Sequence, residues 1–178
     1  REMEGSRTSE LVAVASRYRQ SAEKFFFEFK IQRAYGSYLD LLRDKNVEAV
    51  YIATPHPLHA EWLIKAAEAG KHILCHKPLT LNYAEAMSVV EAVSRHKVFL
   101  MEGLTYRFHP QTAKLIELLR DRAIGEVLFI QATFGLQAPF DLSCPMMNHA
   151  LGGGSILCLG CSLTSMARLV AGAAAGKD

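Results

Sequence analysis

The stretch Val47–Pro78 constrains the fold of this chain more than any other part of it. It opens with Val47–Ala53, a nearly continuous apolar run of the kind that forms a parallel strand buried on both faces. Thr54–Pro57 contains two prolines, which cannot donate to a β-ladder and therefore end the strand. Apolar positions at helical spacing follow over His59–Ala69, and then a second short strand, Ile73–Cys75. The stretch therefore predicts one β-α-β unit that ends in a Lys-Pro turn.

Polar side chains cluster where the two strands of this unit end. Ligands of parallel sheets bind outside the carboxyl ends of the strands, so this edge is where we expect a site. The polar residues at or near these ends are Thr54, His56, His59, His76 and Lys77.

The rest of the chain alternates strands and helices up to about residue 105, and then changes character. Ser21 is a plausible N-cap of the first helix, and Phe25 and Phe29 share a helical face that we expect to pack in the core. The segment Val127–Phe134 alternates like an antiparallel strand. We therefore expect an α/β domain over 1–105 and the beginning of an α+β domain over 106–178. The further strands and helices predicted are Leu11–Ala15, Ala34–Tyr35, Ser37–Lys45, Asn82–His96, Val98–Met101, Gln111–Asp121 and Ser155–Val170.

Composition excludes several classes of function. A formal net charge of +2 over 178 residues is too small to indicate nucleic acid or an anionic membrane as a partner. Because the sequence shows no apolar run of roughly 18 residues, we expect no membrane-spanning helix. Residues 1–10 lack the apolar centre of a signal peptide. Four cysteines in a chain of this size indicate a reducing compartment rather than a disulfide framework, so we expect a cytoplasmic protein.

Four stretches, in this order, together resemble the Gfo/Idh/MocA oxidoreductases, and within that family its dihydrodiol dehydrogenase branch. The resemblance implies a Rossmann domain followed by a C-terminal α/β domain with a large open sheet. It also implies hydride transfer between NAD(P) and a small-molecule diol, polyol or sugar. The four stretches are Val47–Ala86, Val98–Gln111, Ile124–Gly135 and Leu151–Gly160.

The resemblance also implies segments that this sequence does not contain. The family begins with a strand and a G-x-G-x-x-G/A turn whose backbone N–H groups face the pyrophosphate, and Gly5 alone is not that turn. Leu11–Ala15 then corresponds to the second Rossmann strand. We therefore expect an incomplete Rossmann-type doubly wound parallel sheet followed by the start of an α+β substrate domain, truncated at both ends. A second copy or a partner chain would cover the exposed sheet edges.

Carried over residue by residue, the resemblance names a site. Lys77 and Pro78 match the family's Glu-Lys-Pro motif, whose lysine assists proton transfer at the substrate hydroxyl, while His76 replaces the glutamate. Ser16 and Arg17, without a carboxylate, favour NADP, although NAD is possible. The remaining cofactor-binding candidates are Thr54, Pro55, His56 and His59 along the ribose and nicotinamide, and Glu102 and Arg107 toward the nicotinamide amide.

Each of these residues also has a purely structural interpretation. Arg17 and Lys77 would be solvated surface cations, His59 would start a helix, and Glu102 with Arg107 would form an ion pair of little energetic value. The family's second-domain pattern Asp-x-Gly-x-His/Tyr is matched here only by Gly160. This departure leaves open a non-catalytic scaffold or interaction protein as the alternative to an enzyme. The positions of that pattern, with its further Asp, fall on Cys158, Gly160, Ser162 and Ser165.

Cysteine spacing suggests a third hypothesis, a small zinc or redox module. Cys158 and Cys161 are spaced as C-x-x-C, with Cys144 and His149 upstream as further ligands. A single C-x-x-C on an apolar helix is weak evidence, because structural zinc requires four ligands. We therefore favour two small residues packed on one helical face.

Overall fold

A computed structural model of the chain describes residues 6–137, 141 and 144–177. The strands are β1 Ala13–Ala15, β2 Arg33–Tyr35, β3 Ala49–Ile52, β4 His72–His76 and β5 Leu100–Gly103. The α-helices are α1 Arg19–Phe29, α2 Tyr38–Arg43, α3 His59–Glu68, α4 Tyr83–His96, α5 Pro110–Arg120 and α6 Cys161–Ala174. Short 3₁₀ turns cover His56–Leu58 (η1), Thr105–Phe108 (η2) and His149–Leu151 (η3), and Ile156–Gly160 (η4) is π-helical.

The strands form two parallel sheets, which confirms the predicted α/β class with Rossmann-type strands. One sheet pairs β1 with β2, and the other has the order β3-β4-β5. In the second sheet Tyr51 faces Leu74, and Leu74 in turn faces Met101. The predicted β-α-β unit is thus β3-α3-β4, and its carboxyl ends lie next to the end of β5.

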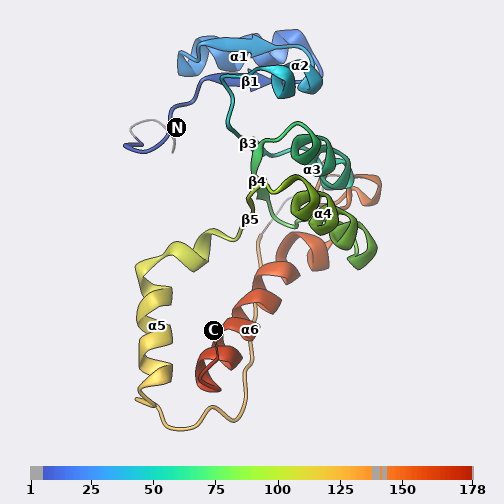
Figure 1. Cartoon of the computed structure of the whole chain (residues 1–178). Helices are drawn as coiled ribbons and strands as arrows, with labels where there is room; N and C mark the ends of the chain where they lie inside the picture. Colours follow the sequence, from blue (N-terminus) through green and yellow to red (C-terminus); the bar gives the residue numbers. More distant parts are fainter. Residues whose placement is uncertain (1–5, 138–140, 142–143, 178) are drawn as a thin grey trace.

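One face of the three-stranded sheet carries the main core. Figure 1 shows α3 and α4 side by side on the same flank of β3, β4 and β5. Leu63 of α3 and Val89 of α4 are fully buried there against Ile73 and Cys75 of β4. Leu42 of α2 belongs to the same cluster. Helix α2 also contacts β1 and β2 and therefore joins the two sheets.

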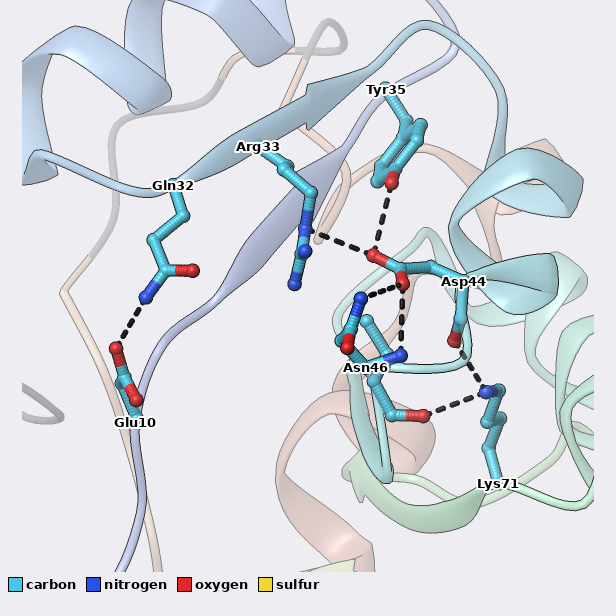
Figure 2. Close-up of polar contacts among 8 residues, drawn as sticks. Glu10, Gln32, Arg33, Tyr35, Asp44, Asn46 and Lys71 are labelled. Atoms are coloured by element: carbon cyan, nitrogen blue, oxygen red, sulfur yellow. Dashed lines mark hydrogen bonds and ion pairs between the residues drawn. The ribbon is translucent and has the colours of Figure 1, made fainter.

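A polar network reinforces this junction (Figure 2). The Asp44 carboxylate, just after α2, accepts hydrogen bonds from the Tyr35 hydroxyl at 3.0 Å and from the Asn46 backbone N–H at 2.9 Å. Arg33 Nε lies 3.0 Å from the same carboxylate, as an ion pair without hydrogen-bond alignment. The Lys71 ammonium, at the start of β4, donates to the carbonyls of Asp44 and Val47, each at 2.7 Å. The loop after α2 is therefore fixed to β2 on one side and to β4 on the other.

The second part of the chain is built differently. In Figure 1, α5 and α6 lie at the end of the molecule opposite α1. The helical stretch His149–Ala174 contains an 18-residue window with a mean hydropathy of 1.6, so it is long and apolar enough for a membrane span by length and composition alone. The expectation that no stretch reaches this limit is therefore wrong. One such helix is weak evidence for a membrane span, and 11% of its apolar window is buried.

Three local predictions are wrong for identifiable reasons. Val127–Phe134 alternates like a strand but forms none, because a strand needs a neighbour and this segment pairs with no other within the described residues. Helix α1 begins with Tyr18 as its N-cap, so Ser21 lies inside the helix. Phe25 and Phe29 do stack on one face, with ring centroids 5.7 Å apart, but Phe25 is half exposed and Ala22 is the buried residue of α1.

Candidate active site

The loops at the carboxyl ends of β3 and β4 are held together by one buried side chain. The His59 side chain has no exposed surface, and it lies at the start of α3. Its Nε2 lies 2.8 Å from the Thr54 carbonyl oxygen, and its Nδ1 lies 2.8 Å from the Pro78 carbonyl oxygen. The β3–α3 loop and the Lys77-Pro78 turn are therefore fixed to each other.

Glu102 holds the same turn from the side of β5. One carboxylate oxygen accepts a hydrogen bond from the backbone N–H of Leu79 at 2.9 Å, one residue after Pro78. Burial raises the pKa of Cys75 on β4, and the negative charge of Glu102 adds to this rise. The ends of all three strands thus converge on the segment around Lys77.

The second part of the chain closes over these loops through backbone carbonyls. The Lys77 ammonium donates a hydrogen bond to the carbonyl of Cys158 in the π-helical turn. His56 Nδ1 lies 3.0 Å from the carbonyl oxygen of Gly152. A π-helical turn within a helix is often found at functional sites, and here it brings a backbone carbonyl to a lysine 81 residues away.

The site is rich in groups that can carry positive charge. The pKa of His76 is lowered, first by burial and then by the nearby cations of Lys77, His59 and His56. His76 is therefore favoured in its neutral form at neutral pH. Burial raises the pKa of the Cys158 thiol against the opposing effect of Lys77. The arrangement places the Lys77 ammonium beside a backbone carbonyl and a neutral His76, which suits proton exchange with a hydroxyl.

Comparison with known proteins decides the family. Residues 2–104 match the family model described as the Gfo/Idh/MocA oxidoreductase family with an NAD-binding Rossmann fold. The chain belongs to the Gfo/Idh/MocA oxidoreductases.

Relatives of known name extend the likeness beyond residue 104. Trans-1,2-dihydrobenzene-1,2-diol dehydrogenase of Mus musculus is 40% identical over 168 residues, covering 92% of this chain and 49% of the mouse protein. D-xylose 1-dehydrogenase (NADP(+)) 2 of Haloferax volcanii is 39% identical over 163 residues, covering 92% and 50%. The chain spans about half the length of the curated relatives it matches.

Solved structures support the same family assignment. A 3-ketoreductase from Actinomadura kijaniata, in complex with TDP-benzene and NADP, superposes with a TM-score of 0.64 at 35% identity over 70% of this chain and 39% of its own. A probable dehydrogenase from Thermotoga maritima reaches 0.75 at 25% identity, over 91% of this chain and 48% of its own. The predicted family, the α/β fold and the NAD(P)-binding class are thus confirmed.

The structure brings together most of the predicted Gfo/Idh/MocA site, and separates part of it. Ser16 and Arg17 follow β1 on the other sheet, where the Arg17 guanidinium lies 5.9 Å from the centre of the Tyr18 ring. Arg107 lies in η2, and its Nε donates to the Ser165 hydroxyl at 3.3 Å. The residues found around the turn after β4 are Thr54, Pro55, His56, His59, His76, Lys77, Pro78 and Glu102.

The residues at the strand ends fit a dinucleotide of the kind that the family binds. The Thr54 hydroxyl oxygen is buried, and it has no hydrogen-bond partner within the part of the chain that the structure describes. A buried hydroxyl without a partner costs free energy, which a polar group of a ligand that reached it would offset. Lys77, Thr54 and the neutral His76 would face such a ligand at the carboxyl ends of β3 and β4.

Some participants could not be found from the sequence. The carbonyls of Cys158 and Gly152 act through the backbone, so their side chains give no signal. The glycine at position 152 is itself a weak signal, because any Cβ there would lie within 2.9 Å of Leu81 and 3.0 Å of His56. Within the described residues, no group of three or more His, Cys, Asp or Glu is arranged to hold a metal ion, so the zinc hypothesis has no support.

Proposed function

We propose that this chain acts as an NADP-dependent oxidoreductase on a diol, polyol or sugar, with Lys77 as the residue that exchanges a proton with the substrate hydroxyl. The observation that carries the proposal is the convergence of three strand ends on Lys77, beside the buried, unpartnered hydroxyl of Thr54. Bound NADP would supply the hydride chemistry at its nicotinamide. Lys77 would hold or release the proton, and His59 and Glu102 would keep its turn in place.

The resemblance to NADP enzymes motivates the choice of cofactor, with NAD as the other possibility. Ser16 and Arg17 follow β1 without a carboxylate, which suits the 2′-phosphate of NADP better than the free ribose of NAD. We expect Arg17→Ala to weaken binding of NADPH while leaving binding of NADH unchanged. Equal weakening of both cofactors would assign Arg17 to the surface instead.

The organisation around this function remains a set of proposals. We divide the chain at residue 105 into a cofactor-binding part, 1–105, and the beginning of the substrate domain, 106–178. All four cysteines are free thiols, which suits the cytoplasm. A second copy or a partner chain would cover the open edges of β1 and β3, as would a preceding or following segment of the same polypeptide.

Binding and turnover test the function directly. NADPH fluorescence titration of the purified chain should give saturable binding, and a panel of diols, polyols and sugars should give cofactor-dependent turnover. Lys77→Ala should lower kcat by about 10²–10⁴-fold, the usual contribution of a general acid–base residue. Lys114→Ala is the matched control, because Lys114 lies on the exposed side of α5, where it pairs with Glu117. No measurable NADPH binding would refute the proposal for this chain and favour the scaffold alternative.

A further inference from the structure

His59 has an unusual environment for a buried histidine, because both of its ring nitrogens face backbone oxygens. The Thr54 and Pro78 carbonyls each lie 2.8 Å from one nitrogen, and the side chain has no exposed surface. A carbonyl oxygen can only accept a hydrogen bond, so hydrogen bonds to both carbonyls at once require a proton on each ring nitrogen. A singly protonated ring would bind one carbonyl and turn a lone pair toward the other.

The remaining neighbours of the ring do not replace these bonds. The Cys75 sulfur lies 3.5 Å from Nδ1, and its thiol donates to the His76 carbonyl at 3.2 Å. The His56 ring centre is 5.6 Å away, and it is another potential cation. His59 and Lys77 both act on His76 through charge, and Glu102 acts on Cys75 in the same way. The two carbonyls are therefore the groups that define the orientation of the ring.

We propose that His59 is a positioning residue for Lys77, acting through its bond to the carbonyl of Pro78. Pro78 is the residue next to Lys77, so the direction of the lysine side chain follows from the place of this peptide. The ring links the turn to the Thr54 carbonyl, and through it to the end of β3. This inference rests on the proposed function for its catalytic meaning, but the positioning itself can be measured without turnover.

The geometry separates this role from two others. A direct cofactor contact, which the sequence suggested for His59, has no ring nitrogen left to make it and no exposed surface to receive a ligand. A role as mere core packing would require only the volume of the ring. A positioning role requires one particular hydrogen bond, the one to Pro78, and predicts that the bond to Thr54 matters less for Lys77.

Two amide variants separate the two bonds. The amide of Asn can place its N–H₂ group near the position of Nδ1, and the longer Gln can place it near the position of Nε2. His59→Asn therefore keeps the donor to Pro78, and His59→Gln keeps the donor to Thr54. Each variant loses one of two bonds of equal length. A purely structural role of His59 therefore predicts a similar change in Lys77 reactivity in both variants.

The first readout is the reactivity of the Lys77 amine, measured by competitive acetylation and peptide mass spectrometry with Lys114 as internal reference. The hydrogen bond to the Cys158 carbonyl should make Lys77 react slowly in the unmodified chain and in His59→Asn. In His59→Gln the Lys77 amine should react about three- to tenfold faster, as expected when a net hydrogen bond is lost. Equal Lys77 reactivity in the two variants would overturn the proposal.

A second measurement does not depend on the variants folding. In the unmodified chain with ¹⁵N-labelled histidine, a ring N–H of His59 should exchange slowly with solvent. A ring whose protons all exchange at the rate of a solvated histidine would overturn the proposal. Should Lys77 reactivity follow His59 as stated while NADPH fails to bind, the positioning role stands and the proposed function falls. Should NADPH bind and kcat fall equally in both variants, the function stands and the positioning role falls.

Discussion

Replacing Lys71 by Met should destabilise the chain more than the same change at an exposed lysine. The Lys71 side chain is 7% exposed, and its ammonium donates to two backbone carbonyls at 2.7 Å. Met keeps the apolar stem and removes the charged donor. The bond to the Val47 carbonyl is buried and the bond to the Asp44 carbonyl is partly reached by water, so we expect a loss of about 2–4 kcal/mol in the free energy of unfolding.

Urea unfolding followed by tryptophan fluorescence measures this loss. Trp62 is the single tryptophan, and its ring centre lies 4.8 Å from that of Tyr38, so it reports on the contact between α3 and α2. With a slope of about 2 kcal/mol/M, the expected loss lowers the midpoint by about 1–2 M. Circular dichroism on the same samples checks that the helices and the tryptophan unfold together.

Lys114→Met provides the control, because the Lys114 and Glu117 side chains of that surface pair are 59% and 55% exposed. Such a pair contributes less than about 1 kcal/mol, so its midpoint should hardly move. Equal midpoints for the two variants would refute the reasoning. They would mean that water satisfies both carbonyls when the ammonium is gone, and that the network in Figure 2 adds nothing to the junction of the sheets.

Three further predictions follow from the same structure. Burial raises the pKa of Cys75 to about 12, so near pH 8 an aromatic disulfide reagent should modify half-buried Cys161 but not Cys75; equal rates would contradict this. The Asn46 backbone N–H lowers the pKa of Asp44, so its contribution to stability is complete above about pH 4 and lost as pH falls through the lower folded value. Thermal unfolding from neutral to acid pH should therefore show a flatter acid limb in Asp44→Asn. Gly152→Ala should lower Tm more than Gly70→Ala, since φ is near +70° at both but only the first Cβ meets side chains; equal shifts would contradict this.

The β-α-β unit was predictable because its signals are local. Prolines after β3, apolar spacing in α3 and a glycine after it mark boundaries within a residue or two of those in the structure. Ser37 likewise caps α2 as a short-range signal suggests, accepting from the Asp40 N–H at 3.4 Å. Val127–Phe134 failed because alternation describes one strand and says nothing about whether another lies beside it.

The candidate site also has a part that local signals predict and a part that depends on long-range packing. That polar residues would gather at the ends of β3 and β4 followed from parallel-strand geometry alone. The contact of Lys77 with the Cys158 carbonyl depends on packing between segments 81 residues apart. The contact of His56 with the Gly152 carbonyl likewise joins segments 96 residues apart. Backbone acceptors leave no trace in residue identity, so no motif could have named them.

This difference bears on the departures from the family pattern in the second part of the chain. A carbonyl accepts a hydrogen bond whatever side chain its residue carries, so Cys158 serves Lys77 as well as an aspartate backbone would. The loss that remains is chemical and lies at Ser162, whose hydroxyl cannot replace His or Tyr in proton transfer without a separate base. Under the proposed function, Lys77 is therefore the described residue that we expect to move the proton at this site. Under the proposed function, the contact of His59 with the Pro78 carbonyl and the hydrogen bond from the Leu79 N–H to Glu102 would hold Lys77 in place for that step.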